Sequence, residues 1–368
     1  MPGRLMTRYA GPVWVLMAAL VLLSARTAAG NPADDELVDD PPLPEPQFEV
    51  SEGAVYDRAF GEGTDRAAGY EQLDTLLRQK IAIVDQVCGL TDTQKQKLRL
   101  AGRGDARRLF DRLDKIGARI QLVGNDRDKI YQLLDEAHSL QRDLIRPGFS
   151  TDGSLFFKSL ERLLTAEQAV KYAPLREIVR AGGLVRIRRD EGAERLEISL
   201  SGTRLVDDEL AHLRELPGLR VLVLTKSQVT DAGLAHLAGL TNLHTLVLSQ
   251  TRVTDTGLAE LKGLTGLREL ALDEAPVTDT GLEYLQGLTS LEYLSLKGTR
   301  VSDAGLACLK RLTRLESLVL DETAVTDAGL VHLQGLVSLE ILLVRRTAVT
   351  NLRIAQLKRT SPRLAIHK

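Results

Sequence analysis

The segment LRVLVLTKSQVTDAGLAHLAGLTN, residues 219–242, decides the fold of this chain, because its 24-residue pattern recurs along the second half of the sequence. The copies follow one another without insertion or deletion, and a partial copy remains at the end. Seven units in one register indicate a repeat array rather than a chance similarity. The copies start at Arg195, Leu219, Leu243, Leu267, Leu291, Leu315 and Leu339, and the partial copy starts at Arg363.

Each unit combines a short strand with a short helix. Leu222 and Leu224 alternate with Val223, which predicts a strand with one face turned to the core. Thr230 is expected to cap a helix whose positive N-terminal end carries Asp231. Further leucines return to the same core at three-residue spacing, namely Leu234, Leu237 and Leu240.

A single unit of this size cannot bury enough apolar surface to stand alone, so neighbouring units must stack into a solenoid. The terminal copies depart from the pattern, as expected for caps. The first copy has Val206 and Glu209 where middle copies have Thr or Ser and Gly, and the last has Asn351 and Arg353 at the Asp and Gly positions.

The pattern L-x-x-L-x-L-x-x-T-x-V-T-D-x-G-L-x-x-L-x-x-L resembles leucine-rich repeats of the cysteine-containing, ribonuclease-inhibitor-like type. Thr, Ser or Ala stand where that type often has Cys or Asn. The resemblance covers the residues from Arg195 onward, and the predicted repeat domain is assigned to residues 184–368. It implies an α/β solenoid of short parallel strands and convex helices, preceded here by an all-α domain.

Residues 1–30 read as an export signal. Arg4 and Arg8 precede an apolar run over residues 12–24, and the small residues Ala28 to Gly30 follow it. The run is short for a membrane span, although an uncleaved anchor stays open as an alternative. We therefore expect an exported protein, either periplasmic, in the cell envelope or secreted, with no membrane span once the signal is cleaved.

Residues 31–63 are acidic and proline-rich, which predicts a disordered linker. Residues 64–183 have a helical period and form the predicted all-α domain, which should join the first repeat through Ala181, Gly182 and Gly183. Thr91 and Thr165 each begin a Thr-x-x-Gln capping box. The two Leu-Thr-x-x-Gln starts resemble those of small periplasmic stress chaperones, and this domain is also similar to a helical segment of exported bacterial proteins.

Composition narrows the function further. The chain has 48 Lys and Arg against 50 Asp and Glu, a formal net charge of −2, so no global field favours nucleic acid or an acidic membrane. The repeat half holds few aromatic residues, Tyr284 and Tyr293, which disfavours a sugar-stacking site. Cys88 and Cys308 are predicted to be small core residues in different domains.

No nucleophile-elbow, phosphate-loop or zinc-protease motif occurs in the sequence, so no catalytic residue and no cofactor are expected. One helix position could in principle bring metal ligands together across the repeats. We interpret it instead as a surface position copied by duplication, and expect no metal there. Its residues are His212, His236, Glu260, Tyr284, Cys308 and His332.

The strand face that points away from the core is the candidate binding site. It begins with small apolar residues, is acidic in the middle and ends basic, which favours a polar partner that is basic in its middle. Charge reversal at both Asp273 and Asp321 is expected to abolish partner binding without changing stability. The candidate residues are Val221, Val223, Thr225, Thr245, Val247, Ser249, Glu269, Asp273, Glu274, Tyr293, Ser295, Lys297, Ser317, Val319, Asp321, Glu322, Arg345 and Arg346.

The sequence thus predicts a non-enzymatic scaffold that binds a protein or peptide outside the cytoplasm. A periplasmic chaperone-like role of the helical domain and a role as glycan binder or envelope-enzyme accessory remain alternatives. Intracellular relatives of this repeat type serve as substrate receptors of ubiquitin ligases, but the adaptor-binding helical motif is not recognisable here. The identity of the partner and the oligomeric state stay open.

Overall fold

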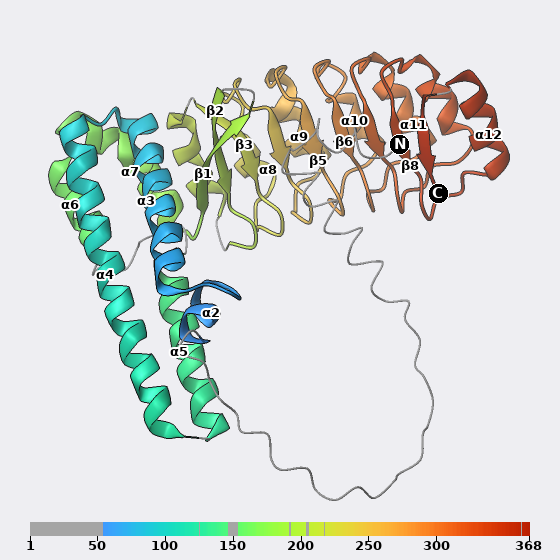
Figure 1. The fold of residues 1–368 in the computed structure, drawn as a ribbon. Helices are drawn as coiled ribbons and strands as arrows, with labels where there is room; N and C mark the ends of the chain where they lie inside the picture. The colour runs from blue at the N-terminus through green and yellow to red at the C-terminus, as the bar shows by residue number, and fades with distance from the viewer. Residues whose placement is uncertain are drawn as a thin grey trace, which may run out of the picture. The chain divides into compact units, whose positions relative to one another are not determined.

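A computed structural model describes residues 54–124, 126–145, 154–190, 193–203, 206–216, 218–361 and 363–368. The predicted signal, residues 1–30, and residues 31–53 of the predicted linker lie outside these residues. The described part begins with helices and continues as a ladder of strands (Figure 1).

The helices before the repeats follow the predicted periodicity. Both predicted capping boxes are present, since the Thr91 and Thr165 hydroxyls accept from the backbone N–H three residues on. Asp65 caps the helix before Thr91, because its side chain accepts from the backbone N–H of Ala68. The helices are α2 (Ala54–Phe60), α3 (Arg66–Cys88), α4 (Asp92–Val123), α5 (Arg127–Ile145), α6 (Leu155–Leu163) and α7 (Ala166–Arg180).

Helix α2 corrects the predicted linker boundary at residue 63. Val55, Tyr56 and Ala59 are buried on one face of α2, and the rings of Tyr56 and Phe60 stack on Phe110 of α4. The linker prediction rested on the average composition of residues 31–63, in which acidic and proline residues dominate. The short apolar segment of α2 contributes too little to change that average. The packed helical region therefore includes residues 54–60.

The repeats form a nine-stranded sheet within the described residues, with strands ordered β1 to β9 as they occur in the sequence. β1 pairs antiparallel with β2, and every later pair is parallel. The register is 24 residues throughout, apart from a one-residue shift between Leu196 and Glu197 in the β2–β3 pair. The strands are β1 (Leu184–Asp190), β2 (Ala193–Ser199), β3 (Leu219–Val223), β4 (Thr245–Val247), β5 (Glu269–Ala271), β6 (Tyr293–Ser295), β7 (Ser317–Val319), β8 (Ile341–Leu343) and β9 (Ala365–His367).

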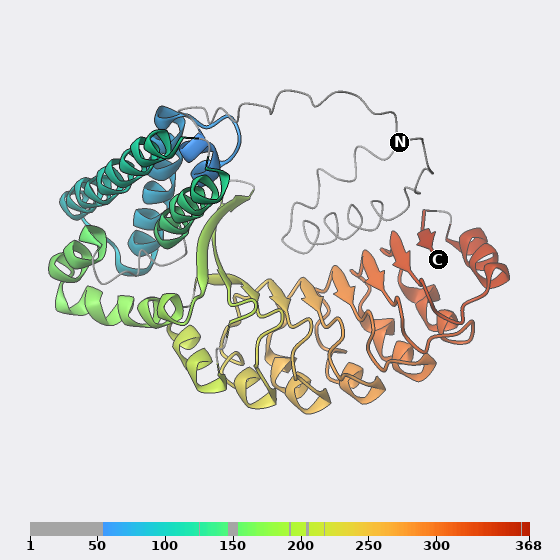
Figure 2. The same cartoon turned by 90° about the horizontal axis from the view of Figure 1, so that it is seen from below.

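Short helices return the chain from each strand to the next. In the repeat region the strands line the inner side of a curve and the helices line its outer side (Figure 2). The α-helices are α8 (Asp231–Leu234), α9 (Asp255–Leu258), α10 (Asp279–Glu283), α11 (Asp303–Leu306) and α12 (Asn351–Thr360). The 3₁₀ helices are η1 (Asp207–Glu215), η2 (Ala259–Gly263), η3 (Ala307–Arg311) and η4 (Gly329–Gly335).

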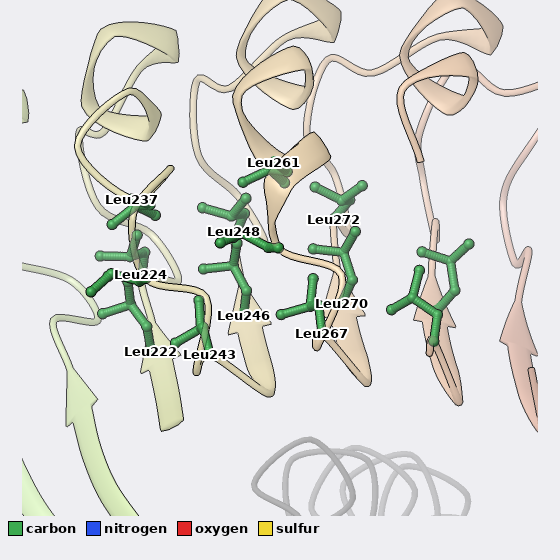
Figure 3. Packing of buried hydrophobic residues seen from close by; sticks show 14 of the residues in the cluster. Leu222, Leu224, Leu237, Leu243, Leu246, Leu248, Leu261, Leu267, Leu270 and Leu272 are labelled. Carbon is green, nitrogen blue, oxygen red and sulfur yellow. The ribbon is translucent and has the colours of Figure 1, made fainter. Parts of the chain in front are cut away.

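The repeat core consists of stacked leucines. Leu246 and Leu248 point into it from β4 and from the residue after β4, Leu261 closes it from η2, and each is fully buried (Figure 3). This core continues without a break into apolar residues of α3, α6 and α7, including Leu77 and Ile178. The first repeat is therefore covered by the helical region, as the sequence predicts, and β1 adds a strand that the sequence did not indicate.

A second element, an aspartate ladder, joins neighbouring repeats on the helix side. Asp231 accepts from the backbone N–H of Thr254 at 2.7 Å and from its hydroxyl at 2.6 Å. The predicted role of Thr230 is therefore wrong in one respect, because its hydroxyl makes no cap to its own helix and donates to Asp207 of the preceding repeat. The other pairs are Asp255 with Thr278, Asp279 with Ser302, Asp303 with Thr326 and Asp327 with Thr350.

The repeated glycine makes room for this aspartate. A Cβ atom on Gly257 would lie 2.4 Å from Oδ1 of Asp231, and equivalent contacts of 2.3–2.4 Å recur in the other middle repeats. The first repeat has Glu209 at this position, where no aspartate of an earlier repeat lies beside it. The last repeat has Asn351 in place of Asp, and Arg353 lies in α12, a ten-residue helix that replaces the four- or five-residue α-helices.

Candidate functional site

The strands place the predicted face in parallel columns, so that each side chain is flanked by its counterparts in adjacent repeats. One column contains Val221, Thr245, Glu269, Tyr293 and Ser317, and the next contains Val223, Val247, Ala271, Ser295 and Val319. Most of these side chains are less exposed than the sequence suggests. Those with less than one tenth of their surface exposed are Val221, Val223, Thr245, Val247, Ser249, Tyr293, Ser295, Ser317, Val319 and Asp321.

The accessible part of the face is the turn that follows each strand. One residue per repeat adopts a left-handed conformation there, with φ between 54° and 66°. In this conformation its backbone N–H donates to the carbonyl of the next repeat, as from Glu274 to Lys297 at 2.7 Å, and so extends the ladder beyond the strand. The column, here called the turn column, is Gly202, Lys226, Gln250, Glu274, Gly298, Glu322 and Arg346.

Five of the seven turn-column residues carry a side chain where glycine would adopt the same conformation without strain. A left-handed conformation costs an L-residue about 1–2 kcal/mol. The sequence reasoning included Glu274, Glu322 and Arg346 but missed Lys226 and Gln250. A signal was available, because Gly202 and Gly298 occupy this same position in other copies.

Asp273 is an internally bonded carboxylate. It accepts hydrogen bonds from the hydroxyls of Ser249 and Ser295 and from the backbone N–H of Lys297. Burial raises the pKa of Asp273 above its usual range, although these hydrogen bonds act in the opposite direction. A lysine here would break three hydrogen bonds, so we now expect reversal of this charge to lower stability, in place of the unchanged stability expected from the sequence.

Asp321 has a similar structural role. Its Oδ1 atom accepts from the backbone N–H of Arg345 at 2.7 Å, and burial raises the pKa of Asp321. The neighbouring Glu322 instead projects to solvent, where it pairs with Arg346 at 3.1 Å and with Lys297 at 3.7 Å. On the strand side of the middle repeats, the exposed acidic residues therefore belong to the turn column, at Glu274 and Glu322.

The two ends of the candidate face differ in accessibility. Val221 and Val223, the apolar end, are buried, whereas Arg345 and Arg346, the basic end, are exposed. In the middle, Glu269 is half-buried and accepts from the Thr245 hydroxyl at 3.0 Å. Thr225 and Lys297 are also half-buried.

The helix position that could have assembled a metal site does not do so in the described residues. No group of three His, Cys, Asp or Glu side chains there is close enough to hold a metal ion. Tyr284 instead lies under the ammonium of Lys262, 4.9 Å from the ring centre. The two cysteines are both free thiols.

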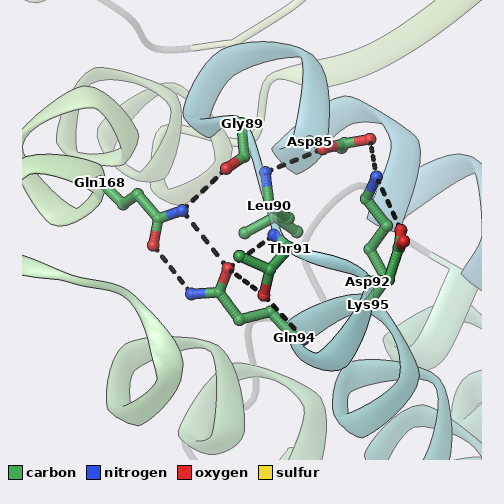
Figure 4. Close-up of polar contacts among 8 residues, drawn as sticks. All are labelled: Asp85, Gly89, Leu90, Thr91, Asp92, Gln94, Lys95 and Gln168. Carbon is green, nitrogen blue, oxygen red and sulfur yellow. Dashed lines mark hydrogen bonds and ion pairs between the residues drawn. The ribbon is translucent and has the colours of Figure 1, made fainter.

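The two glutamines of the capping boxes meet each other, although they are 74 positions apart in the chain (Figure 4). The amide of Gln94 donates to the side-chain oxygen of Gln168 at 2.8 Å and to the carbonyl of Leu163 at 2.7 Å. Gln168 donates to the carbonyl of Gly89 at 2.9 Å. Both side chains are buried, so in this structure they join the start of α4 to the start of α7.

A small cavity of about 140 Å³ lies between α3, α6, α7 and β1. Phe156, Tyr172 and Leu175 contribute apolar walls, and Lys80 contributes a buried amino nitrogen. Burial lowers the pKa of Lys80 to about 7.

Within the described residues, no helix is long and apolar enough to span a bilayer.

Comparisons with known proteins agree with the repeat geometry. A leucine-rich repeat family model matches residues 239–262 and 287–310. No curated protein matches the chain.

Two crystal structures of Listeria monocytogenes internalins align with part of the chain. Internalin C2 is 26% identical over 46% of this chain and 79% of its own, with a TM-score of 0.37. The internalin inlF is 20% identical over 43% of this chain and 56% of its own, with a TM-score of 0.28. Because the 24-residue register, the parallel ladder and the family model all coincide, the region from Arg195 onward is a leucine-rich repeat solenoid.

Proposed function

We propose that this protein is a non-enzymatic scaffold that binds a protein or peptide partner outside the cytoplasm through the strand side of its repeats. The leucines, the aspartate ladder and its glycine hold the repeats together, and these residues vary little among the middle copies. The turn column is free of these roles and changes charge from copy to copy. This variation on a constant frame is what a recognition surface requires.

One observation carries the proposal. Five side chains of the turn column stay in a left-handed conformation, of which Lys226, Glu274, Glu322 and Arg346 are charged and exposed. Residues held in such conformations cluster at functional sites, because the strain must be offset elsewhere. Glu274 and Glu322 flank Gly298, so the column favours a partner with basic groups opposite these carboxylates.

The test is a pair of double charge reversals in the full chain. Lysine occurs naturally in the left-handed position at Lys226, so Glu274→Lys with Glu322→Lys keeps an acceptable backbone. The matched control is Glu260→Lys with Glu283→Lys, which changes charge equally at exposed helix-side positions. Partner capture from extracts of the source cells should be lost with the first variant and kept with the control.

Thermal unfolding of both variants checks that the fold is intact. The exposed pairs that Glu322 makes contribute little to stability, so both variants should melt near the wild type. Equal capture by all three proteins would contradict a binding role for the turn column, as would equal loss in both variants.

A further inference from the structure

Helix α4 presents a basic surface to solvent that is separate from the repeat face. Its apolar residues, among them Leu98, Leu109 and Ile116, are buried on one side of the helix. The exposed cations follow the other side at helical spacing. This surface, here called the α4 basic face, consists of Lys97, Arg107, Arg108, Arg112 and Lys115.

The cations of the α4 basic face are not neutralised by neighbours. Two other arginines of the helix do form ion pairs, Arg103 with Asp74 at 3.0 Å and Arg119 with Glu136 at 2.9 Å. Across the part of the chain that the structure describes, the five cations of the face form no such pair. The exposed carboxylates of α4 that lie among them are Asp111 and Asp114, and Asp114 pairs with Arg66 at 3.1 Å. Their charge is therefore available to an anionic partner.

Two exposed leucines lie on the same side of the helix. Leu100 is 63% exposed and Leu122 is 86% exposed. They are 22 positions apart, which corresponds to roughly 33 Å along the helix. Positions 97, 100, 108, 111, 115 and 122 fall along one side of the helix, so Leu100 and Leu122 share a stripe with Lys97, Arg108 and Lys115. Arg107 and Arg112 flank this stripe on its two sides. A soluble polyanion would contact the cations but would make no apolar contact with the exposed leucines at both ends.

We propose that the α4 basic face binds peripherally to a bilayer surface rich in anionic lipids. The Arg and Lys side chains would contact the lipid phosphates, while Leu100 and Leu122 enter the boundary between headgroups and acyl chains. Because charge is screened within about 8 Å at physiological salt, this local cluster acts on a membrane even though the whole chain is nearly neutral.

Vesicle flotation of the full chain tests the proposal. The vesicles contain phosphatidylcholine alone or phosphatidylcholine and phosphatidylglycerol in equal amounts, and binding to the first is subtracted because it does not depend on lipid charge. We expect binding to the anionic vesicles that falls steeply as salt is raised. Absence of this charge-dependent binding would overturn the proposal.

Charge variants assign the binding to α4. The triple change Arg107→Gln, Arg108→Gln and Arg112→Gln should weaken partitioning roughly 100-fold, since each basic residue contributes about fivefold at an anionic surface. The control, Lys310→Gln with Arg311→Gln and Arg314→Gln, removes the same charge from exposed positions of the repeats and should bind like the wild type. Equal loss in both triples would contradict a specific role of α4.

The leucines separate a membrane from a soluble polyanion. Leu100→Gln with Leu122→Gln should weaken vesicle binding several-fold and leave retention on heparin unchanged. Both residues are exposed, so the variant should keep the wild-type melting temperature. If the leucine variant binds vesicles as tightly as the wild type, the face recognises anionic charge alone and the membrane assignment fails.

Discussion

The aspartate ladder makes a quantitative prediction about two residues in neighbouring repeats, Asp231 and Gly257. The three atoms nearest to a Cβ on Gly257 all belong to Asp231, namely Oδ1 at 2.4 Å and Cα and Cγ at 3.1 Å. Asp231 in turn bonds to both the N–H and the hydroxyl of Thr254. As a single change, Asp231→Ala should therefore lower the stability of the protein. It should also remove most of the steric obstacle to an alanine at position 257.

The expected magnitudes follow from the contacts. Asp231→Ala loses two hydrogen bonds to an ionised group, each worth about 1.5–3 kcal/mol, and partial exposure favours the lower value, for a total of about 3 kcal/mol. Gly257→Ala forces a methyl group into the carboxylate and should cost about 3 kcal/mol through overpacking and disrupted bonds. With Asp231 already truncated, Oδ1 and Cγ are absent, and alanine is favoured over glycine in a helix by about 1 kcal/mol.

The double variant should therefore lose about 2 kcal/mol rather than about 6 kcal/mol, a coupling of about 4 kcal/mol. Urea unfolding followed by circular dichroism measures this coupling, provided that the slope with denaturant is the same for all four proteins. Gly239→Ala is the control, because no atom lies within 4 Å of a Cβ built at Gly239. Additive costs, or a Gly257→Ala cost no larger than the control, would refute the account of the ladder.

Three further predictions concern the helical region. The lowered pKa of Lys80 means that the unfolded chain binds more protons between pH 7 and the usual lysine pKa, so stability should rise with pH across this window by up to about 1.4 kcal/mol per unit. Lys80→Met should remove this rise in pH-dependent urea unfolding, whereas methionine at an exposed lysine of α4 should keep it. Burial raises the pKa of the Cys88 thiol to about 11, so a thiol reagent should label the half-buried Cys308 first and Cys88 only after denaturation; equal native labelling would contradict this. Gln94→Ala removes buried hydrogen bonds to α7 and to the end of α6 and should lower the free energy of unfolding by about 1–3 kcal/mol, and an unchanged value would show that the contact is dispensable.

The repeat architecture could be predicted because its period is unbroken. A fixed 24-residue spacing places Leu222, Leu246 and Leu270 in one row of the core, and the structure confirms that these rows are in register. The aspartate ladder could not be read from a single unit, since the partner of Asp231 lies in the next copy. Comparing copies offers the missing signal, because the glycine is replaced in both terminal copies and the aspartate is replaced in the last one.

Elements outside the period were harder to predict. Helix α2 lies within an acidic, proline-rich stretch, and it owes its place to packing against Phe110, far along the chain. β1 pairs antiparallel with β2, the first strand of the repeats, but it precedes the first copy, so the repeat period does not indicate it. The alternation along each strand predicts which side chains point away from the core, but not how exposed they are. Their exposure depends on how closely the side chains of neighbouring strands flank them. Asp273 illustrates the difference, because it resembles a surface charge in sequence but is an acceptor for three donors.

The charge balance of the chain shows why a bulk quantity says little about binding. A formal net charge of −2 arises from 48 basic and 50 acidic residues, and many of these form hydrogen bonds or ion pairs within the protein. The residues of the aspartate ladder serve to hold adjacent repeats together, and Asp273 and Asp321 serve the strand face. What remains accessible is unevenly distributed, with unpaired cations along α4 and carboxylates at Glu274 and Glu322 in the turn column. Because the field at a surface is set by charges within about a Debye length, these two groups can select different partners in spite of the neutral total.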